Sequence, residues 1–240
     1  RIRDYDSSRH RALYNSNIPE NVYDNLVQTV RDNIDALHSH AELKREFLGV
    51  EELGMHDLYV PIAQGSPEID FEEAKEHIIE ALQPLGDDYV ERVEEAFEER
   101  WIDVYENKGK RSGAYSGGSY DTPPFILMNF QNDISSMYTL AHELGHSMHS
   151  DYTTSNQPYV YGGYTIFVAE VASTVNETLL TRHLLETVED REFRMHVLNH
   201  ALENFRNTLF RQTMFADFEQ RAHGVVENDE PLTPEKASKM

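Results

Sequence analysis

The chain has 240 residues, of which 39% are hydrophobic, and its 43 acidic and 21 basic side chains give a formal net charge of −22. This acidity excludes a nucleic-acid partner, whose phosphates need a basic surface, and the lack of an apolar run of about 20 residues excludes a membrane span. No cysteine is present, which excludes disulfides and thiolate metal sites and favours a reducing, cytoplasmic location.

Apolar side chains at helical spacing predict a helical start to the chain. After Pro19 they recur as far as Leu48, which predicts one long helix that Gly49 ends. The next segment, residues 57–62, is expected to form a short strand or an extended piece.

Two further helices are expected before residue 105. Asp70 is a residue type that caps helices, and the helix that it begins is expected to reach Pro84. Another helix is expected to begin at about Gly86 and to extend through Trp101 to Val104, with Trp101 in the core. Both helices would contribute apolar side chains to one core.

Glycines interleaved with tyrosines interrupt this helical pattern. They predict a β-hairpin or small sheet over about residues 108–130, followed by a helix that Asn132-Asp133 caps. A polar and aromatic connection is expected over 150–164. Helices are then expected over about 165–187 and 190–224, so the fold class is mainly α.

The helix after Asp133 carries a pattern suited to a metal. His142 and His146 are four residues apart, so both imidazoles can face one ion, and Glu143 would lie beside it. Zinc suits such ligands, and Glu143 would take a proton from the zinc-held water and pass it to the leaving amine. Gly145 is small enough to let another backbone or a substrate come close. The alternative is an ordinary amphipathic helix.

A third ligand is expected on the following helix. Glu170 is a carboxylate in an apolar stretch, and glutamate is seldom buried unless it is paired or binds metal; the alternative is a solvated face. Glu177 lies two turns further on and is expected to accept the free N–H of a ligand imidazole. His149 shares a face with His142 and is expected to support the site rather than bind zinc. Ser173 and Thr174 either support Glu170 or fill the helix.

The predicted hairpin is expected to contact substrate. An edge strand can pair with a peptide backbone and give affinity without demanding a particular sequence. Gly113, Ala114, Tyr115 and Tyr120 are the candidate substrate-binding residues, and either tyrosine could help to stabilise an oxyanion.

Several runs of the chain match the pattern of one known family. They are His142–His149, Phe167–Thr174 with Asn176-Glu177, Lys110–Tyr115, Thr122–Asn129 and, more loosely, Asp57–Pro61. This set closely resembles the oligoendopeptidase F branch of the thimet oligopeptidase family of zinc metallopeptidases. The resemblance implies a multi-helix zincin-type metallopeptidase core that cleaves short peptides in a deep channel. It also implies one zinc ion held by His142, His146 and Glu170, with Glu143 as the base.

The resemblance also implies a longer protein. Family members are about twice as long or more, and they place a histidine and tyrosines for transition-state stabilisation beyond the part matched here. Because the chain begins at Arg1 and stops at Met240, we expect residues 1–240 to be part of one catalytic domain, truncated at both ends. Within it, 1–106 would be a helical region and 107–240 the zinc-site region. Such a fragment can bind zinc and still lack turnover.

The function predicted from the sequence is zinc-dependent hydrolysis of internal bonds in short peptides. One alternative in the same class is a zinc aminopeptidase or carboxypeptidase, which needs a group that captures a peptide terminus. Another is a non-catalytic, zinc-stabilised peptide-binding fragment. Cobalt and manganese can share the same ligands. The negative charge would attract cationic peptides. It can equally serve solubility or reflect a salt-rich cytoplasm.

Overall fold

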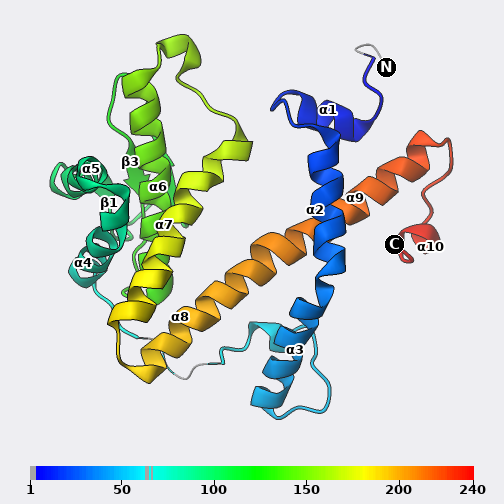
Figure 1. The fold of residues 1–240 in the computed structure, drawn as a ribbon, viewed down its shortest axis with the longest axis horizontal. Coiled ribbons are helices and arrows are strands. Elements are labelled where there is room, and N and C mark those ends of the chain that lie inside the picture. The colour runs from blue at the N-terminus through cyan, green and yellow to red at the C-terminus, as the bar shows by residue number, and fades with distance from the viewer. Residues whose placement is uncertain (1–3, 63–64, 66) are drawn as a thin grey trace. The chain divides into compact units, whose positions relative to one another are not determined.

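The computed structural model describes residues 4–62, 65 and 67–240 (Figure 1). Contacts divide the chain into two units, one made of residues up to 62 together with 201–240, the other of residues 63–200. The expected division into 1–106 and 107–240, within one catalytic domain, stays a prediction, and Arg1 lies outside the described residues.

The first unit is helical in all its described regular elements. Asn33 breaks the single long helix expected before Gly49, because its φ of −114° and ψ of 19° are not helical; Gly49 ends the second piece at a φ of 67°. The strand or extended piece expected at 57–62 is wrong, since it begins with a 3-10 turn. The elements are α1 (Ser8–Tyr14), α2 (Glu20–Asp32), α3 (Ile34–Leu48), η1 (Asp57–Tyr59), the end of α8 (Arg191–Asn204), the π-helical η4 (Phe205–Phe210), α9 (Arg211–Glu227) and α10 (Pro234–Ala237).

A buried lysine helps to hold this unit together. Lys44 of α3 is buried, and its Nζ donates to the Leu58 carbonyl and lies 3.3 Å from Glu203. Arg206 of η4 donates to the same carboxylate at 2.8 Å. A buried cation is tolerated only when it is paired in this way, so α3 and η4 are tied by charge as well as by packing.

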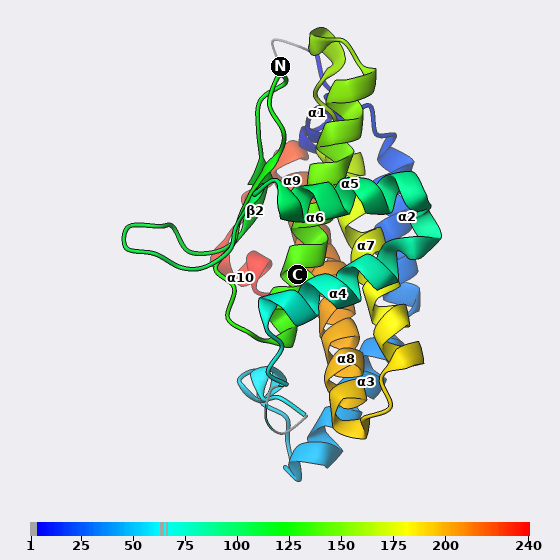
Figure 2. The same ribbon diagram turned by 90° about the vertical axis from the view of Figure 1, so that its left-hand side faces the viewer.

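The described part of the second unit is built around α6 and α7. The two long helices run side by side, and α4 and α5 cover them in Figure 2. Asp70 and Asp133 cap α4 and α6 as expected, each accepting a backbone N–H. The elements are α4 (Phe71–Leu82), η2 (Gln83–Leu85), α5 (Asp87–Glu98), α6 (Ile134–Asn156), η3 (Tyr159–Tyr161), α7 (Ile166–Thr187) and the beginning of α8.

The helix expected to carry Trp101 and Val104 ends earlier. α5 stops at Glu98, and Arg100 takes a left-handed φ of 64° that turns the chain. Trp101 is in the core as expected, only 2% exposed, with the Arg92 guanidinium 4.8 Å above its ring. The apolar residues after the turn continue the helical spacing by chance. They belong to an extended segment, whose side chains can also point into the core.

A three-stranded sheet follows this turn. Its strands are β1 (Ile102–Asp103), β2 (Tyr115–Gly117) and β3 (Phe125–Leu127), in the order β1-β3-β2. β2 and β3 form the expected hairpin, with Ser116 opposite Ile126, while β1 adds a parallel strand that the sequence pattern did not predict. Within the described chain β2 is therefore an edge strand, and it packs against α6. The prediction of a mainly helical fold with a small sheet beside this helix is confirmed.

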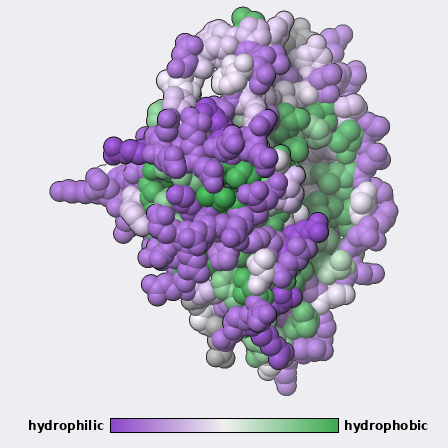
Figure 3. All heavy atoms as spheres, turned by 60° about the vertical axis from the view of Figure 1, so that its left-hand side comes forward, coloured by the Kyte–Doolittle hydropathy of each residue, from purple (hydrophilic) through white to green (hydrophobic). Residues whose placement is uncertain are grey.

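Both hydrophilic and apolar residues reach the surface, and hydrophilic ones cover most of the face in Figure 3. None of the helices in the described ranges is long and apolar enough to cross a bilayer.

Candidate metal centre

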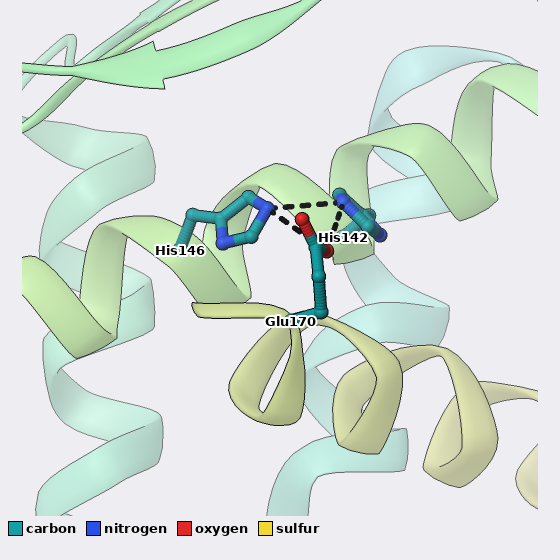
Figure 4. Close-up of side chains that lie close together, drawn as sticks. All are labelled: His142, His146 and Glu170. Atoms are coloured by element: carbon teal, nitrogen blue, oxygen red, sulfur yellow. Dashed lines mark hydrogen bonds and ion pairs between the residues drawn. The ribbon is translucent and has the colours of Figure 1, made fainter. Parts of the chain in front are cut away.

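α6 positions the two histidines one turn apart on a face that points at α7 (Figure 4). The helices approach closely because Gly145 lies between them. A Cβ atom at Gly145 would lie 2.6 Å from the Cα of Ser173, which is closer than such atoms normally approach. The small residue expected to admit another backbone therefore admits that of α7, which brings Glu170 to the histidines.

Three side-chain atoms converge at this point. The Nε2 atoms of His142 and His146 lie 3.0 Å apart, and Glu170 Oε2 lies 3.4 Å and 3.5 Å from them. Ligands about 2.0–2.2 Å from a tetrahedral zinc ion lie about 3.3–3.6 Å from one another. The two distances to Glu170 fall in this range, and the two imidazoles are slightly closer together than zinc ligands. The donor set suits zinc, and among the described residues these three form a group that could hold a metal ion.

Ser173 and Thr174 fix the ligand end of α7. Ser173 is buried and its Oγ lies 3.0 Å from Glu170 Oε2, while Thr174 donates to the Glu170 carbonyl. The apolar neighbourhood expected to bury Glu170 is exposed instead, since the Glu170 side chain is 53% exposed and Phe167 is 57% exposed. Burial was the wrong reason for singling out Glu170, although its carboxylate does face the two histidines.

Glu177 holds the ring of His142. Its Oε1 lies 2.5 Å from His142 Nδ1, and because an ionised carboxylate can only accept, Nδ1 carries the proton and Nε2 keeps a lone pair for a metal. Burial lowers the pKa of His142, but the hydrogen bond and charge of Glu177 outweigh it and raise that pKa overall.

Glu143 lies on the same helix and is only 7% exposed. Burial raises the pKa of its carboxyl, and the nearby charges of His142 and His146 offset only part of that rise. The backbone N–H of Ser116 in β2 faces the carboxylate and also offsets part of that rise in pKa. A carboxylate with a raised pKa, placed between two metal-binding residue types and a strand edge, is suited to proton transfer.

Comparison with known proteins assigns the chain to a family. The sequence pattern of peptidase family M3 matches residues 1–240. The chain belongs to this family. It is 51% identical over 236 residues to oligopeptidase PepF of Bacillus subtilis and 49% identical over 235 residues to group B oligopeptidase PepB of Streptococcus agalactiae. These matches cover 98% of this chain and 35% and 39% of the relatives, so the chain spans little more than a third of their length.

Solved structures agree with this assignment. The crystal structure of oligoendopeptidase-F from Enterococcus faecium superposes with a TM-score of 0.68 at 37% identity, covering 98% of this chain and 34% of that one. A crystal structure from Chlamydophila abortus reaches a TM-score of 0.90 at 38% identity, covering 98% and 40%. The mainly helical fold is therefore that of M3 relatives.

His149 lies at the border of the site in this member of the family. Its ring stacks on Tyr164 at 3.8 Å and lies near the backbone of Ala169, the residue before Glu170. Its buried Nδ1 has no hydrogen-bond partner among the described residues. Burial lowers the pKa of His149. These contacts place it next to the ligand helix, and it does not belong to the group of converging metal-binding atoms among the described residues. Its supporting role stays a prediction.

Two residues that the sequence reasoning missed touch the site. Asn176 is 1% exposed and donates to the carbonyl of Ala141, the residue before His142, at 3.1 Å. Ser116 contacts Glu143 through its backbone, and its Oγ lies 2.8 Å from Ser147 Oγ. An amide inside an apolar helix is a weak signal, but the partner of Asn176 depends on how α6 and α7 pack. A backbone contact such as that of Ser116 leaves no side-chain signal.

The predicted substrate-binding residues lie along and beyond β2. Gly113 has a left-handed φ of 88° and its carbonyl accepts from Asn129 at 2.8 Å; Ala114 follows it into the strand. Tyr115 pairs with Leu127 and its side chain is exposed. Tyr120 lies in the loop after β2, where its hydroxyl donates to the Gln157 carbonyl at 2.6 Å. Contact of these residues with a substrate stays a prediction.

Proposed function

We propose that this chain carries the metal-binding and proton-transfer part of a zinc-dependent endopeptidase that hydrolyses short peptides. The observation that supports it most is the convergence of His142, His146 and Glu170 beside the buried carboxylate of Glu143. Membership of peptidase family M3 supports the same reaction class. The cytoplasmic location stays a prediction from the lack of cysteine.

Each residue of the site would have a separate role. His142 Nε2, His146 Nε2 and Glu170 would hold the ion, and Glu177 keeps the His142 ring in the tautomer that leaves Nε2 free. Zinc, when bound, lowers the pKa of water to about 7 and acts as a Lewis acid. Glu143 would accept the proton of the attacking water and return it to the leaving amine, and its burial keeps competing water away.

The edge of β2 supplies a surface for a peptide backbone. The N–H of Ile126 in β3 donates to the Trp101 carbonyl, on the side of β1. Ser116, opposite Ile126, therefore directs its own N–H and carbonyl away from β3; the N–H faces Glu143, so the carbonyl is the group left for a peptide. By strand alternation, Ala114 and Gly118 direct their backbone groups the same way. A peptide paired there would be held by main-chain bonds, whose strength does not depend on the peptide's sequence.

We expect Glu143→Gln to keep zinc and to lose hydrolysis, because an amide has the shape of the carboxylate but takes no proton. The fall in turnover should be at least about 10²-fold, the usual contribution of a general base. The measurement combines bound zinc, by mass spectrometry, with cleavage of an internally quenched peptide blocked at both ends. The control is Glu186→Gln, which changes an exposed glutamate on α7.

The outcomes separate the alternatives. The endopeptidase proposal is supported if the parent chain binds zinc and cleaves the blocked peptide, and if Glu143→Gln binds zinc but no longer cleaves it. Cleavage only of peptides with a free terminus indicates an exopeptidase. Zinc without any cleavage indicates a peptide-binding fragment, and undiminished turnover in Glu143→Gln contradicts the base assignment.

A further inference from the structure

A pocket of about 290 Å³ lies in the second unit, between the loop that joins β2 to β3 and the end of α6. Its lining comes from Tyr120, Ser150, Thr154, Tyr159, Gly162 and Gly163, with four neighbours from the β2–β3 loop. This volume is at the lower end of the range for small-molecule pockets and is large enough for a single side chain. Figure 2 shows the loop running along α6.

The pocket continues the helix face that carries the metal ligands. Ser150 and Thr154 follow His146 by four and eight residues, so all three project from one side of α6. At a rise of 1.5 Å per residue they lie about 6 Å and about 12 Å beyond the histidine. An extended peptide advances about 3.3 Å per residue. The pocket is therefore about two to three peptide residues from a bond held at the metal centre.

The direction of β2 decides which side of that bond the pocket serves. β2 advances from Ser116, beside Glu143, toward Gly118, which lines the pocket. A peptide that adds to this edge in the favoured antiparallel sense runs the opposite way, with its amino-terminal part beside Gly118. The pocket then receives a residue on the amino-terminal side of the scissile bond.

The residues that line the pocket favour binding of an aromatic side chain. No charged residue contributes to it, although the chain carries a net charge of −22. The two hydroxyls that α6 contributes already have protein partners: Ser150 bonds Tyr164 at 2.9 Å, and Thr154 bonds the Asp151 carbonyl at 3.2 Å. The rings of Tyr120 and Tyr159 meet edge to face at 5.4 Å, an arrangement that a third ring can extend.

We propose that this pocket binds an aromatic side chain of the substrate, two to three residues before the scissile bond; this rests on the proposed endopeptidase function. Two glycines make room for it. A Cβ at Gly162 would lie 2.8 Å from the Tyr120 ring, whereas a Cβ at Gly163 would meet open space. Gly163 lines the pocket, and a side chain added there would not strain the backbone.

The test uses binding rather than turnover. The probes are end-blocked octapeptides of alanine and serine in which a phosphinic group replaces the scissile amide and fixes the register at zinc. One phenylalanine is moved along the series, and dissociation constants are measured with the zinc-loaded chain. Phenylalanine two or three residues before the phosphinic group should tighten binding about tenfold over the alanine parent, because the pocket buries part of the ring.

Gly163→Phe should remove this tenfold preference. Gly224→Phe is the matched control, since a Cβ at Gly224 also meets open space and the residue lies in the other unit. Tyr159→Ala, which changes an exposed wall residue, should remove the preference as well. An unchanged preference in both pocket variants, or one located after the phosphinic group, overturns the proposal. Failure of every peptide to bind, the parent included, overturns the proposed function too.

Discussion

Asn176 joins three helices through one buried amide. It donates to the Ala141 carbonyl of α6 at 3.1 Å and accepts from the Tyr89 hydroxyl of α5 at 3.0 Å. Burial raises the pKa of Tyr89 to about 12, so this hydroxyl keeps its proton at neutral pH. The amide thereby holds the backbone next to His142.

We expect Asn176→Leu to lower the free energy of unfolding by about 1–3 kcal/mol, because it removes two hydrogen bonds and leaves the Tyr89 hydroxyl without its partner. Tyr89→Phe removes only one bond and should cost about 1 kcal/mol. Urea denaturation followed by circular dichroism measures both values. Equal losses in the two variants would show that the Ala141 contact adds nothing.

His200 is a buried group whose protonation opposes folding. It stacks on Tyr138 at 3.9 Å, and burial lowers its pKa, which the charge of Glu177 offsets only in part. Because the unfolded histidine titrates near 6.5, the unfolded state binds the proton first as pH falls. The stability that depends on a neutral His200 is therefore present at pH 8 and is lost as pH falls below about 6.5.

We expect His200→Phe, which keeps the stacking, to reduce this acid loss. The difference in unfolding free energy between variant and parent should become more favourable to the variant from pH 8 to pH 5.5. Urea denaturation at the two pH values checks it. A difference that does not change with pH would mean that His200 is protonated equally in the folded and unfolded chain.

At the scale of elements, the approach of α6 and α7 depends on Gly145. An added methyl group would meet the backbone of Ser173, which cannot move without shifting the helix that carries Glu170. We expect Gly145→Ala to lower the free energy of unfolding by about 1–3 kcal/mol and to weaken zinc binding at least severalfold. Chemical denaturation and chelator competition measure the two effects.

Gly224→Ala is the control for this substitution. Gly224 lies within α9, where an added Cβ meets open space, so alanine should stabilise the helix by up to about 1 kcal/mol. The same substitution is thus expected to lower the free energy of unfolding at Gly145 and to raise it at Gly224. Destabilisation of similar size at both would indicate that helix packing at Gly145 is not the cause.

At the scale of the whole molecule, metal binding should stabilise the folded chain. The donors come from α6 and α7, which meet only on folding, so zinc binds the folded state better than the unfolded one. Free zinc at about 100 times its dissociation constant should add about 2.7 kcal/mol. Thermal unfolding with zinc and with chelator measures this difference.

Glu170→Ala should abolish most of that difference, while Glu186→Gln, on the same helix, should preserve it. Zinc stabilisation of unchanged size in Glu170→Ala would remove Glu170 from the ligand set. Since unfolding is measured here, this result does not depend on whether the chain turns over peptides.

Much of the helical structure follows from local signals. Asp70 and Asp133 begin helices because their side chains accept backbone N–H groups within the next turn, and Gly49 ends one because it adopts a left-handed conformation easily. The break at Asn33 and the end of α5 before Trp101 were missed. In both places the chain changes direction, but apolar residues after the change continue the helical spacing. The sequence pattern therefore does not reveal the end of the helix.

The histidine pair and Glu143 can be predicted from the sequence alone, because an α-helix places residues four apart on one face whatever surrounds it. The edge strand and the charge of the surface can be predicted in the same way. The approach of Ser173 to Gly145, the contact of Asn176 with Ala141 and the position of the Ser116 N–H beside Glu143 are seen only in the folded chain. These contacts join residues far apart in the chain, so they depend on how helices and sheet pack, which periodicity along the sequence does not encode.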